Sequence, residues 1–395
     1  MSKRTTPKSD PLDLAGIDDL LSPEEKVVRQ TVRQVCDASV EPHIAGWYES
    51  GELPTVRELA RELGSLGLLG MHLEGYGCAG TSAVEYGLAC LELEATDSGL
   101  RSLVSVQGSL AMYAIHRFGS EEQKREWLPR MATGEAIGCF GLTEPDHGSD
   151  PGGMRTRARR DGSDWVLDGR KMWITNGSVA SVAVVWARTE EGVRGFVVPT
   201  DAPGFSAPPI KHKGSLRASV TSELLLDGVR LPADAVLPDV TGLRGPLSCL
   251  NEARYGILWG ALGAARSCFR TALAYAKERE QFGKPLAGFQ LTQAKLASMA
   301  VELTNGTLLA LHLGRRKDSV GLRPEQVSLG KLNNVGKALD IARTSRTILG
   351  ANGISLEFPV MRHMANLESV LTYEGTAEMH TLMIGQALTG ESALR

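Results

Sequence analysis

At residues 165–177 the chain reads WVLDGRKMWITNG, a β-rich stretch that lies between long segments of helical character. Its β-branched and aromatic residues flank Asp168-Gly169, a pair that favours a tight turn between two strands. We therefore expect two short strands joined at Asp168-Gly169. Further strands are expected in the short apolar runs at 182–187, 195–199 and 224–231.

Helical patterns occupy the sequence on both sides of this β-region. Ser22-Pro23-Glu24-Glu25 is typical of a helix start, with a hydroxyl cap, proline at the first helical position and glutamate at the third. Leu59, Leu63, Leu66 and Leu69 recur at helical spacing. Longer helices are expected at 257–279, 291–313 and 327–349, whose spacing suits antiparallel packing with short loops.

The order of segments predicts an α+β protein with three folded parts. We expect a polar lead at 1–20, a helical domain at 21–137, a β-domain at 138–243 and a helical bundle at 244–395.

Composition excludes several functional classes. Apolar residues make up 42% of the 395 residues and charged residues 23%, which is typical of a globular protein. A net charge of −3 gives no reason to expect nucleic acid or an anionic membrane as a partner. No apolar run reaches the roughly 18 residues of a membrane span, and residues 1–10 lack the apolar core of a secretory signal. We expect a cytoplasmic protein.

Cysteine and histidine spacing argues against a metal site or a disulfide framework. The eight histidines show no ligand spacing, and the cysteines contain no C-x-x-C pair. The six cysteines are Cys36, Cys78, Cys90, Cys139, Cys249 and Cys268. Their scatter favours unpaired thiols in a reducing compartment.

The segment Thr372-Tyr373-Glu374-Gly375-Thr376 is the strongest candidate for catalysis. Gly375 favours a tight turn, and Thr376 is a suitable cap for the amphipathic run 377–388. A glutamate held on such a turn beside an aromatic ring would be partly desolvated, and desolvation raises a carboxylate's pKa towards a working general base. Read alone, the pentapeptide is more typical of a solvated loop glutamate, and only the rest of the chain favours the catalytic interpretation.

Several other motifs allow both a functional and a structural interpretation. Gly75–Gly80 matches G-x-G-x-x-G, but the expected strand before it is replaced by a helical leucine repeat, so a dinucleotide site is not favoured. The loop 140–150 offers hydroxyls and backbone N–H groups for a polar heterocycle, or it is a cluster of turns. Trp173 would stack on a flat ring or sit in the core.

Two arginines are equally ambiguous on local evidence. Arg279 would neutralise a helix C-terminus, or grip a pyrophosphate while Phe282 packs on an aromatic base. Arg101 would be an exposed residue near a helix start, or a carboxylate-binding fork assisted by Ser102 and Ser105.

Taken together in chain order, these segments resemble the acyl-CoA dehydrogenase family from about residue 20 onward. The matching motifs are Leu142–Pro145 with Gly148–Asp150, Trp173–Asn176, Arg279 with Gln281–Gly283, and Tyr373–Thr376. Each is weak alone, but four in register are specific. The resemblance implies a homotetramer that binds FAD, each subunit having an N-terminal helical domain, a middle β-barrel or sandwich domain and a C-terminal four-helix bundle.

The resemblance also implies which residues hold FAD. The flavin and ribityl parts would contact Phe140, Leu142, Thr143, Gly148, Ser149, Trp173, Ile174 and Thr175. A neighbouring subunit's FAD would be reached by Arg279, Phe282, Gln290, Thr347, Leu349, Gly350 and Ala351. Thr376 and Glu378 would complete the site. Many relatives carry glutamine at position 347 and glycine at position 351.

Substrate roles follow from the same resemblance. The acyl-CoA channel would be lined by Ser149, Leu247, Leu250, Asn251 and Arg254, with Tyr373 and Gly375 beside the base. Glu374 would remove the α-proton while the β-hydride moves to flavin N5, with the thioester carbonyl polarised by the Glu374 N–H and a ribityl hydroxyl. Some relatives carry their base at the position of Ala253, and Glu252 next to it is expected to point elsewhere.

The pattern around Arg101 resembles family members that act on glutaryl-CoA. Arg101 would bind the distal carboxylate, assisted by Ser102, with Glu94 and Ser105 tuning the site, since an unpaired buried cation is costly. Loss of CO2 and reprotonation by Glu374 would give crotonyl-CoA, and electrons would pass to an electron-transfer flavoprotein.

Three alternatives stay open at this point. A non-decarboxylating dicarboxyl-CoA or short-chain acyl-CoA dehydrogenase would share the fold. An NAD-linked enzyme would use Gly75–Gly80, and a catalytically silent scaffold would not need Glu374.

Overall fold

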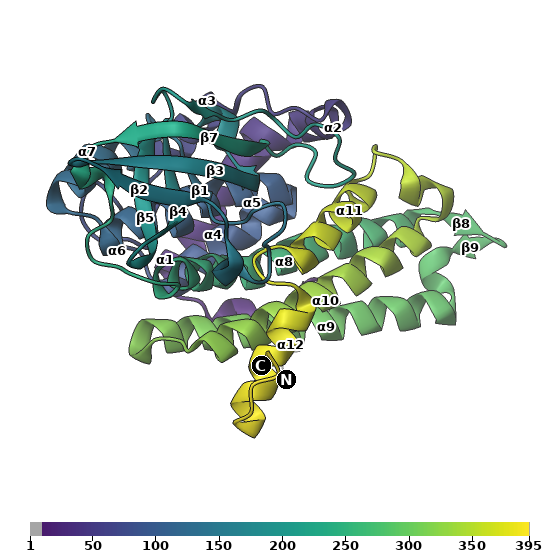
Figure 1. Cartoon of the computed structure of the whole chain (residues 1–395). Coiled ribbons are helices and arrows are strands. Elements are labelled where there is room, and N and C mark those ends of the chain that lie inside the picture. The colour runs from purple at the N-terminus through teal and green to yellow at the C-terminus, as the bar shows by residue number, and fades with distance from the viewer. Residues whose placement is uncertain (1–9, 395) are drawn as a thin grey trace.

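The computed structural model describes residues 10–394, which form a helical layer, a curled sheet and a long helical bundle (Figure 1). The helices before the sheet are α1 (Pro23–Val35), α2 (Glu41–Ser50), α3 (Val56–Ser65), α4 (Ala83–Thr96), α5 (Ser98–Ser105), α6 (Tyr113–Phe118) and α7 (Glu121–Ala132). The predicted cap of α1 is confirmed, because Ser22 and Glu25 form a reciprocal capping box.

The sheet lies at one end of the molecule. Its strands are β1 (Gly138–Gly141), β2 (Arg157–Asp161), β3 (Asp164–Thr175), β4 (Val182–Thr189), β5 (Gly192–Pro199), β6 (Phe205–Ser206) and β7 (Thr221–Leu231). Within the described residues the order is β1-β4-β2-β3-β7-β6, with β5 paired to β4. The expected strands at 182–187, 195–199 and 224–231 are confirmed.

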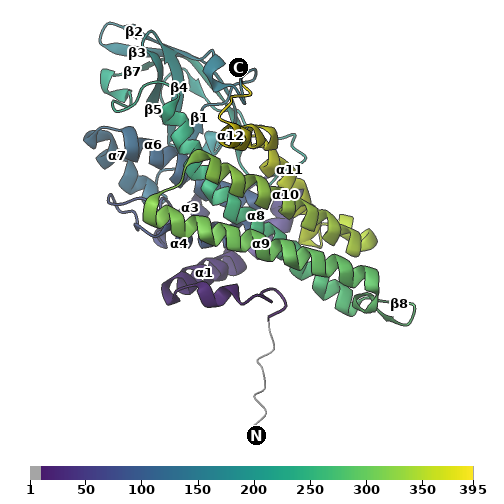
Figure 2. The ribbon, with the colours of Figure 1, turned by 90° about the horizontal axis from the view of Figure 1, so that it is seen from below.

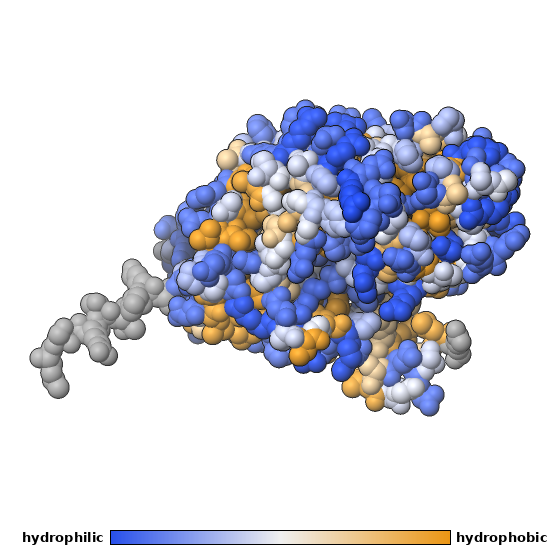
Figure 3. Space-filling model, turned by 90° about the vertical axis from the view of Figure 1, so that its left-hand side faces the viewer, coloured by the Kyte–Doolittle hydropathy of each residue, from blue (hydrophilic) through white to orange (hydrophobic). Residues whose placement is uncertain are grey.

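The bundle consists of α8 (Arg244–Glu278), α9 (Gln290–Val320), α10 (Pro324–Ile348) and α11 (Pro359–Thr372), and α12 (Ala377–Thr389) projects from it. The short hairpin β8 (Glu280–Gln281) and β9 (Lys284–Pro285) lies at the end of the bundle remote from the sheet (Figures 1 and 2). The α, β, α order and the bundle are therefore as predicted. Apolar residues face outward on the projecting α12 (Figure 3), among them Leu388, which is 81% exposed.

The predicted hairpin at Asp168-Gly169 is wrong. Both residues lie inside the single long strand β3, which pairs with β2 on one side and β7 on the other. The turn lies one strand earlier, where Asp161 pairs with Asp164 around a two-residue loop. Gly169 instead serves a close approach, because a Cβ there would lie 2.5 Å from the Thr156 hydroxyl. An Asp-Gly pair can therefore mark a hairpin turn, or a glycine that close packing requires inside a strand.

The helical leucine repeat is also shorter than expected. Helix α3 ends at Ser65, so Leu66 is 41% exposed and Leu69 is buried from a loop. No strand precedes Gly75–Gly80 within residues 10–74, which contradicts a dinucleotide fingerprint there. Among residues 10–394, no helix is long and apolar enough to cross a membrane.

Small residues let α8 approach α4 closely. A Cβ at Gly263 of α8 would lie 1.9 Å from the Leu91 carbonyl oxygen of α4, and backbone cannot yield as a flexible side chain does. The contact therefore requires glycine at position 263.

We expect Gly263→Ala to lower the free energy of unfolding by about 3 kcal/mol, because the added methyl group must push two helices apart. Thermal unfolding followed by circular dichroism measures the effect. Gly336→Ala in α10 is the matched control, since nothing lies within 4 Å of its Cβ position. The control should be stabilised by up to about 1 kcal/mol. Equal unfolding temperatures for the two variants would contradict the packing argument.

Candidate active site

Glu374 lies on the turn between α11 and α12, as the sequence predicted. Its backbone is left-handed, with φ of +52°, and Gly375 follows with φ of +94°. Such a conformation is costly for a residue with a side chain and persists only where the surroundings hold it. Thr376 caps α12 by accepting a hydrogen bond from the Met379 N–H at 3.3 Å.

Two buried cations hold the backbone of this turn. Lys331 Nζ donates to the carbonyl oxygens of Tyr373 at 2.5 Å and Gly375 at 2.7 Å. Arg254 Nε donates to the carbonyl oxygen of Glu374 between them, at 2.7 Å. Three successive carbonyl groups are thus bound by charged donors, which offsets the strain at Glu374.

The Glu374 carboxylate is buried among three cations. Burial raises its pKa, and the charges of Arg101, Lys331 and Arg254 act in the opposite direction. Its Oε2 atom is buried and has no hydrogen-bond partner among the described residues. The solvated-loop alternative is therefore wrong, and a carboxylate with one free buried oxygen is equipped to accept a proton.

Arg101 is buried beside Glu374 and only 1% exposed, so the exposed-arginine alternative is wrong. Its Nε donates to Glu94 Oε2 at 2.7 Å, and its Nη2 donates to the Tyr373 hydroxyl. Ser98 donates to the other Glu94 oxygen at 2.9 Å. These contacts fix the guanidinium against Tyr373, the residue that precedes Glu374 on the turn.

The serines expected near Arg101 are also buried. Ser102 and Ser105 belong to α5, and the Ser105 hydroxyl has no hydrogen-bond partner within residues 10–394. An unpaired hydroxyl in a buried polar region is costly unless a ligand or water binds it. The Ser105 hydroxyl, about one helical turn after Arg101 on α5, is therefore available to a ligand or water.

Helix α8 supplies the other side of this region. Leu247, Leu250, Asn251 and Arg254 all lie on it, and Asn251 Oδ1 accepts a hydrogen bond from Arg254 Nη1 at 3.2 Å. Ala253 is fully buried, and Glu252 pairs with Lys317 of α9 at 2.9 Å. Glu252 is thus engaged away from the turn, as expected.

The loop after β1 is fixed by a buried ion pair. Lys171 of β3 donates to the Leu142 carbonyl oxygen at 3.1 Å and to Glu144 at 2.9 Å. Although burial alone would raise it, the Arg155 N–H and the Lys171 charge lower the pKa of Glu144 to about 2. Phe140 and Leu142 are buried, whereas Gly148 and Ser149 are exposed. The carbonyl oxygen of Thr143 accepts a hydrogen bond from the Met172 N–H of β3 at 2.9 Å.

Trp173 departs from the core position usual for a tryptophan on a strand. It is 57% exposed, with φ of +63°, because the register of β3 against β7 shifts between Lys171 and Ile174. The shift turns the indole outward, while Ile174 stays buried and Thr175 half-buried.

Comparison with known proteins identifies this arrangement. The acyl-CoA dehydrogenase N-terminal, middle and C-terminal domain families match residues 22–135, 139–229 and 241–389. The chain belongs to the acyl-CoA dehydrogenase family. It is an enzyme of that type, and its cofactor is FAD.

Individual relatives span nearly the whole chain. A glutaryl-CoA dehydrogenase structure from Mycobacterium smegmatis is 72% identical, with a TM-score of 0.97, covering 98% of this chain and 100% of that one. A second, described as in complex with FADH2, is 66% identical, with a TM-score of 0.96, covering 98% and 99%. The bovine mitochondrial short-chain specific acyl-CoA dehydrogenase is 34% identical, covering 91% of this chain and 88% of its own length.

The residues of this acyl-CoA dehydrogenase fit a flat cofactor. The outward-facing indole of Trp173 would offer a stacking surface to the flavin, because it follows Met172, whose N–H anchors the 140–149 loop. The free Glu374 oxygen and the free Ser105 hydroxyl mark polar positions that ligands would satisfy. No group of histidine, cysteine and carboxylate side chains in the described part of the chain is arranged to hold a metal.

A second set of predicted cofactor residues lies at the remote end of the bundle. It comprises Arg279, Phe282, Gln290, Thr347, Leu349, Gly350 and Ala351, which lie in the β8-β9 hairpin or next to the ends of α8, α9 and α10. The hairpin label marks this end of the bundle in Figures 1 and 2. One chain does not bring these residues to the 140–149 loop. Phe282 is 95% exposed, with φ of +52°, and Asn352 is bonded to Tyr275 of α8 at 3.2 Å. Leu349, in contrast, is 1% exposed, so its side chain is not free to contact a ligand.

Sequence reasoning missed three buried groups around Glu374. Lys331, His380 and Ser328 carry no motif, because a lysine or histidine on a helix is usually solvated. His380 Nδ1 lies 3.0 Å from the Ser328 hydroxyl, and burial lowers the pKa of His380 to about 3. The remaining predicted residue of α12, Glu378, is exposed.

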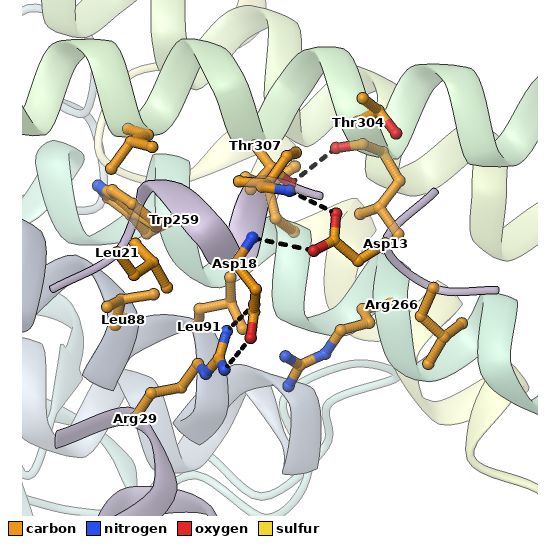
Figure 4. Close-up of a pocket in the computed structure, with 15 residues that line it drawn as sticks. Asp13, Asp18, Leu21, Arg29, Leu88, Leu91, Trp259, Arg266, Thr304 and Thr307 are labelled. Atoms are coloured by element: carbon orange, nitrogen blue, oxygen red, sulfur yellow. Dashed lines mark hydrogen bonds and ion pairs between the residues drawn. The ribbon is translucent and has the colours of Figure 1, made fainter. Parts of the chain in front are cut away.

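A cavity of about 80 Å³ lies elsewhere, between the first described residues and the bundle (Figure 4). Leu21, Leu88, Leu91 and Trp259 form its apolar wall, and the Asp18–Arg29 ion pair closes one side. None of the predicted site residues lines it.

Proposed function

We propose that this acyl-CoA dehydrogenase oxidises and decarboxylates glutaryl-CoA to crotonyl-CoA and CO2. The observation that carries the proposal is the buried guanidinium of Arg101, bonded to the residue that precedes Glu374. Two relatives of 66% and 72% identity are described as glutaryl-CoA dehydrogenases, which supports the same substrate here.

The charges at the site favour a substrate with a second carboxylate. Arg101, Lys331 and Arg254 are cations, whereas Glu94 and Glu374 are the carboxylates facing them. With all five groups ionised, one positive charge is left over, and an unpaired buried charge is costly. A thioester with a distal carboxylate supplies the missing anion, and a plain fatty acyl chain does not.

The reaction uses the free oxygen of Glu374. Glu374 takes the α-proton of the thioester, and bound FAD supplies the acceptor for the β-hydride, so that a double bond forms between the α and β carbons. The bond from the γ-carbon to the distal carboxylate then breaks, CO2 leaves, and the electron pair delocalises into the thioester. Protonated Glu374 returns its proton to the γ-carbon, which gives crotonyl-CoA.

We propose further that the enzyme is a homotetramer that passes electrons to an electron-transfer flavoprotein. The exposed Phe282 and the apolar residues of α12 support assembly, since large exposed apolar side chains are usually covered by a partner. An FAD site built by two subunits would explain why the predicted FAD residues form two separate sets in one chain.

Incubating the purified holoenzyme with glutaryl-CoA and an artificial electron acceptor tests the reaction. We expect mass spectrometry to find crotonyl-CoA, and CO2 in equal amount. Accumulation of glutaconyl-CoA instead would indicate a non-decarboxylating enzyme. Turnover of butyryl-CoA in preference to glutaryl-CoA would overturn the dicarboxylate assignment.

A further inference from the structure

The contacts of Lys331 bear on the thioester carbonyl as well as on the fold. A peptide bond is planar and trans, so the carbonyl of Tyr373 and the N–H of Glu374 belong to one rigid unit and point in opposite directions. Lys331 binds the carbonyl end of that unit at 2.5 Å. The opposite end is the N–H that the proposed reaction uses to polarise the thioester.

The neighbouring peptide units are held in the same way. Arg254 binds the Glu374 carbonyl oxygen, and Lys331 binds that of Gly375. Lys331 therefore fixes the unit before Glu374 and the unit after Gly375 with one ammonium group, and Arg254 fixes the unit between them. Because hydrogen bonds in a chain polarise one another, a cation on the carbonyl also makes the N–H at the other end a stronger donor.

Lys331 is a buried lysine and not a surface charge. It lies two turns into α10 and is 1% exposed. A buried lysine is rare without a dedicated partner. The charged groups acting on it come from three other elements, namely Glu374 on the turn, Arg254 on α8 and Arg101 on α5. His380 of α12 is buried nearby, and the charge of Lys331 contributes to keeping it neutral.

We propose that Lys331 is a positioning residue of the reaction, which orients and strengthens the Glu374 N–H as the donor to the thioester carbonyl and stabilises the ionised Glu374 side chain. This inference deepens the proposed function and rests on it. Lys331 touches neither the substrate nor the cofactor in this role and acts through the turn.

The mutual effect of Lys331 and Glu374 on their pKa values supports this role. Burial lowers the pKa of Lys331 to about 7, and the charge of Glu374 opposes that shift. In return, the charge of Lys331 lowers the pKa of Glu374 against the effect of burial. The base must be deprotonated to work, so turnover rises with pH through the pKa of Glu374. Loss of the lysine charge moves that rise to higher pH.

We expect Lys331→Met holoenzyme to lose about 10- to 100-fold in kcat for glutaryl-CoA, with a smaller change in KM. The loss should be below that of a deleted oxyanion donor, because the N–H itself stays. The acid limb of the kcat profile should move up by about one pH unit, since one adjacent charge is gone. Lys331→Gln, which keeps a donor and removes the charge, should recover part of kcat and show the same pH shift.

A spectroscopic measurement separates polarisation from general disruption. In Glu374→Gln holoenzyme with bound glutaryl-CoA, labelled with 13C at the thioester carbonyl, infrared spectroscopy reports the strength of the hydrogen bond to that carbonyl. Adding Lys331→Met should raise the stretching frequency. Lys337→Met is the control, because Lys337 lies on the same helix and pairs with Glu302 at 3.2 Å, away from the turn.

The outcomes distinguish this inference from the proposed function. Wild-type enzyme that does not oxidise glutaryl-CoA would overturn the proposed function. Wild-type enzyme that does, with unchanged kcat, pH profile and carbonyl frequency in the Lys331 variants, would overturn the role of Lys331 alone. A fall in kcat without a pH shift or a frequency shift would show that Lys331 only supports the fold. That result would also overturn its proposed role as a positioning residue.

Discussion

Replacing Glu374 with glutamine is expected to lower kcat for glutaryl-CoA by about 10⁴-fold, the upper range for a general base. The amide has the shape of the carboxylic acid but cannot accept the α-proton. The turn should survive, because Lys331 and Arg254 hold its backbone and not its side chain. Rapid-mixing absorbance of the flavin on adding glutaryl-CoA measures the loss directly.

The matched control for this prediction is Glu368→Gln. Glu368 lies on α11 just before the turn and forms an exposed ion pair with Arg343 at 2.6 Å, so its loss should leave kcat unchanged. Substrate affinity of the Glu374→Gln enzyme, titrated through the flavin spectrum, should stay within a few-fold of wild type. A Glu374→Gln enzyme with more than about a tenth of wild-type kcat would assign the base elsewhere.

Removing Arg101 is expected to have the second largest effect on the reaction, a rise in KM for glutaryl-CoA. Arg101→Ala should raise KM for glutaryl-CoA by about 100-fold, because truncating one member of a buried charge pair costs about 2–5 kcal/mol. The same change should leave turnover of butyryl-CoA, which has no distal carboxylate, unimpaired. Steady-state kinetics with both thioesters provide the comparison.

Glu94 complicates that experiment, and a double variant resolves it. Arg101→Ala leaves the fully buried Glu94 without its cation, which destabilises the protein. Arg101→Met with Glu94→Gln removes both charges and should restore thermal stability. If the high KM for glutaryl-CoA persists in the double variant, Arg101 binds the substrate carboxylate directly. If it returns to the wild-type value, Arg101 serves only to neutralise Glu94.

The elements predicted well from sequence are those governed by local rules. The cap at Ser22, the cap at Thr376 and the long helices of the bundle follow from residue types within a few positions. The hairpin predicted at Asp168-Gly169 was wrong because the same dipeptide suits a tight turn and a strand position packed closely against another residue. Only the contact with Thr156 decides between the two.

The candidate site was predictable only in part, for a similar reason. Glu374 and Arg101 stand in recognisable motifs, whereas the significance of Lys331 depends on burial from a distant helix. Its contacts to Tyr373 and Gly375 join residues 42 and 44 positions apart. Side-chain burial at such separation leaves no periodic signal in the sequence. The outward turn of Trp173 likewise depends on a register shift against β7.

The ion pair between Arg101 and Glu94 also has a consequence for the order in which the chain is made. Its two members are seven residues apart, whereas Tyr373 follows Arg101 by 272 residues. During synthesis, N-terminal segments fold while later ones are still absent. Arg101 therefore has its counter-ion from the outset and need not wait, uncompensated, for the aromatic hydroxyl. Under the proposed function, the half of the site that would select the substrate can form well before the half that would perform the chemistry exists.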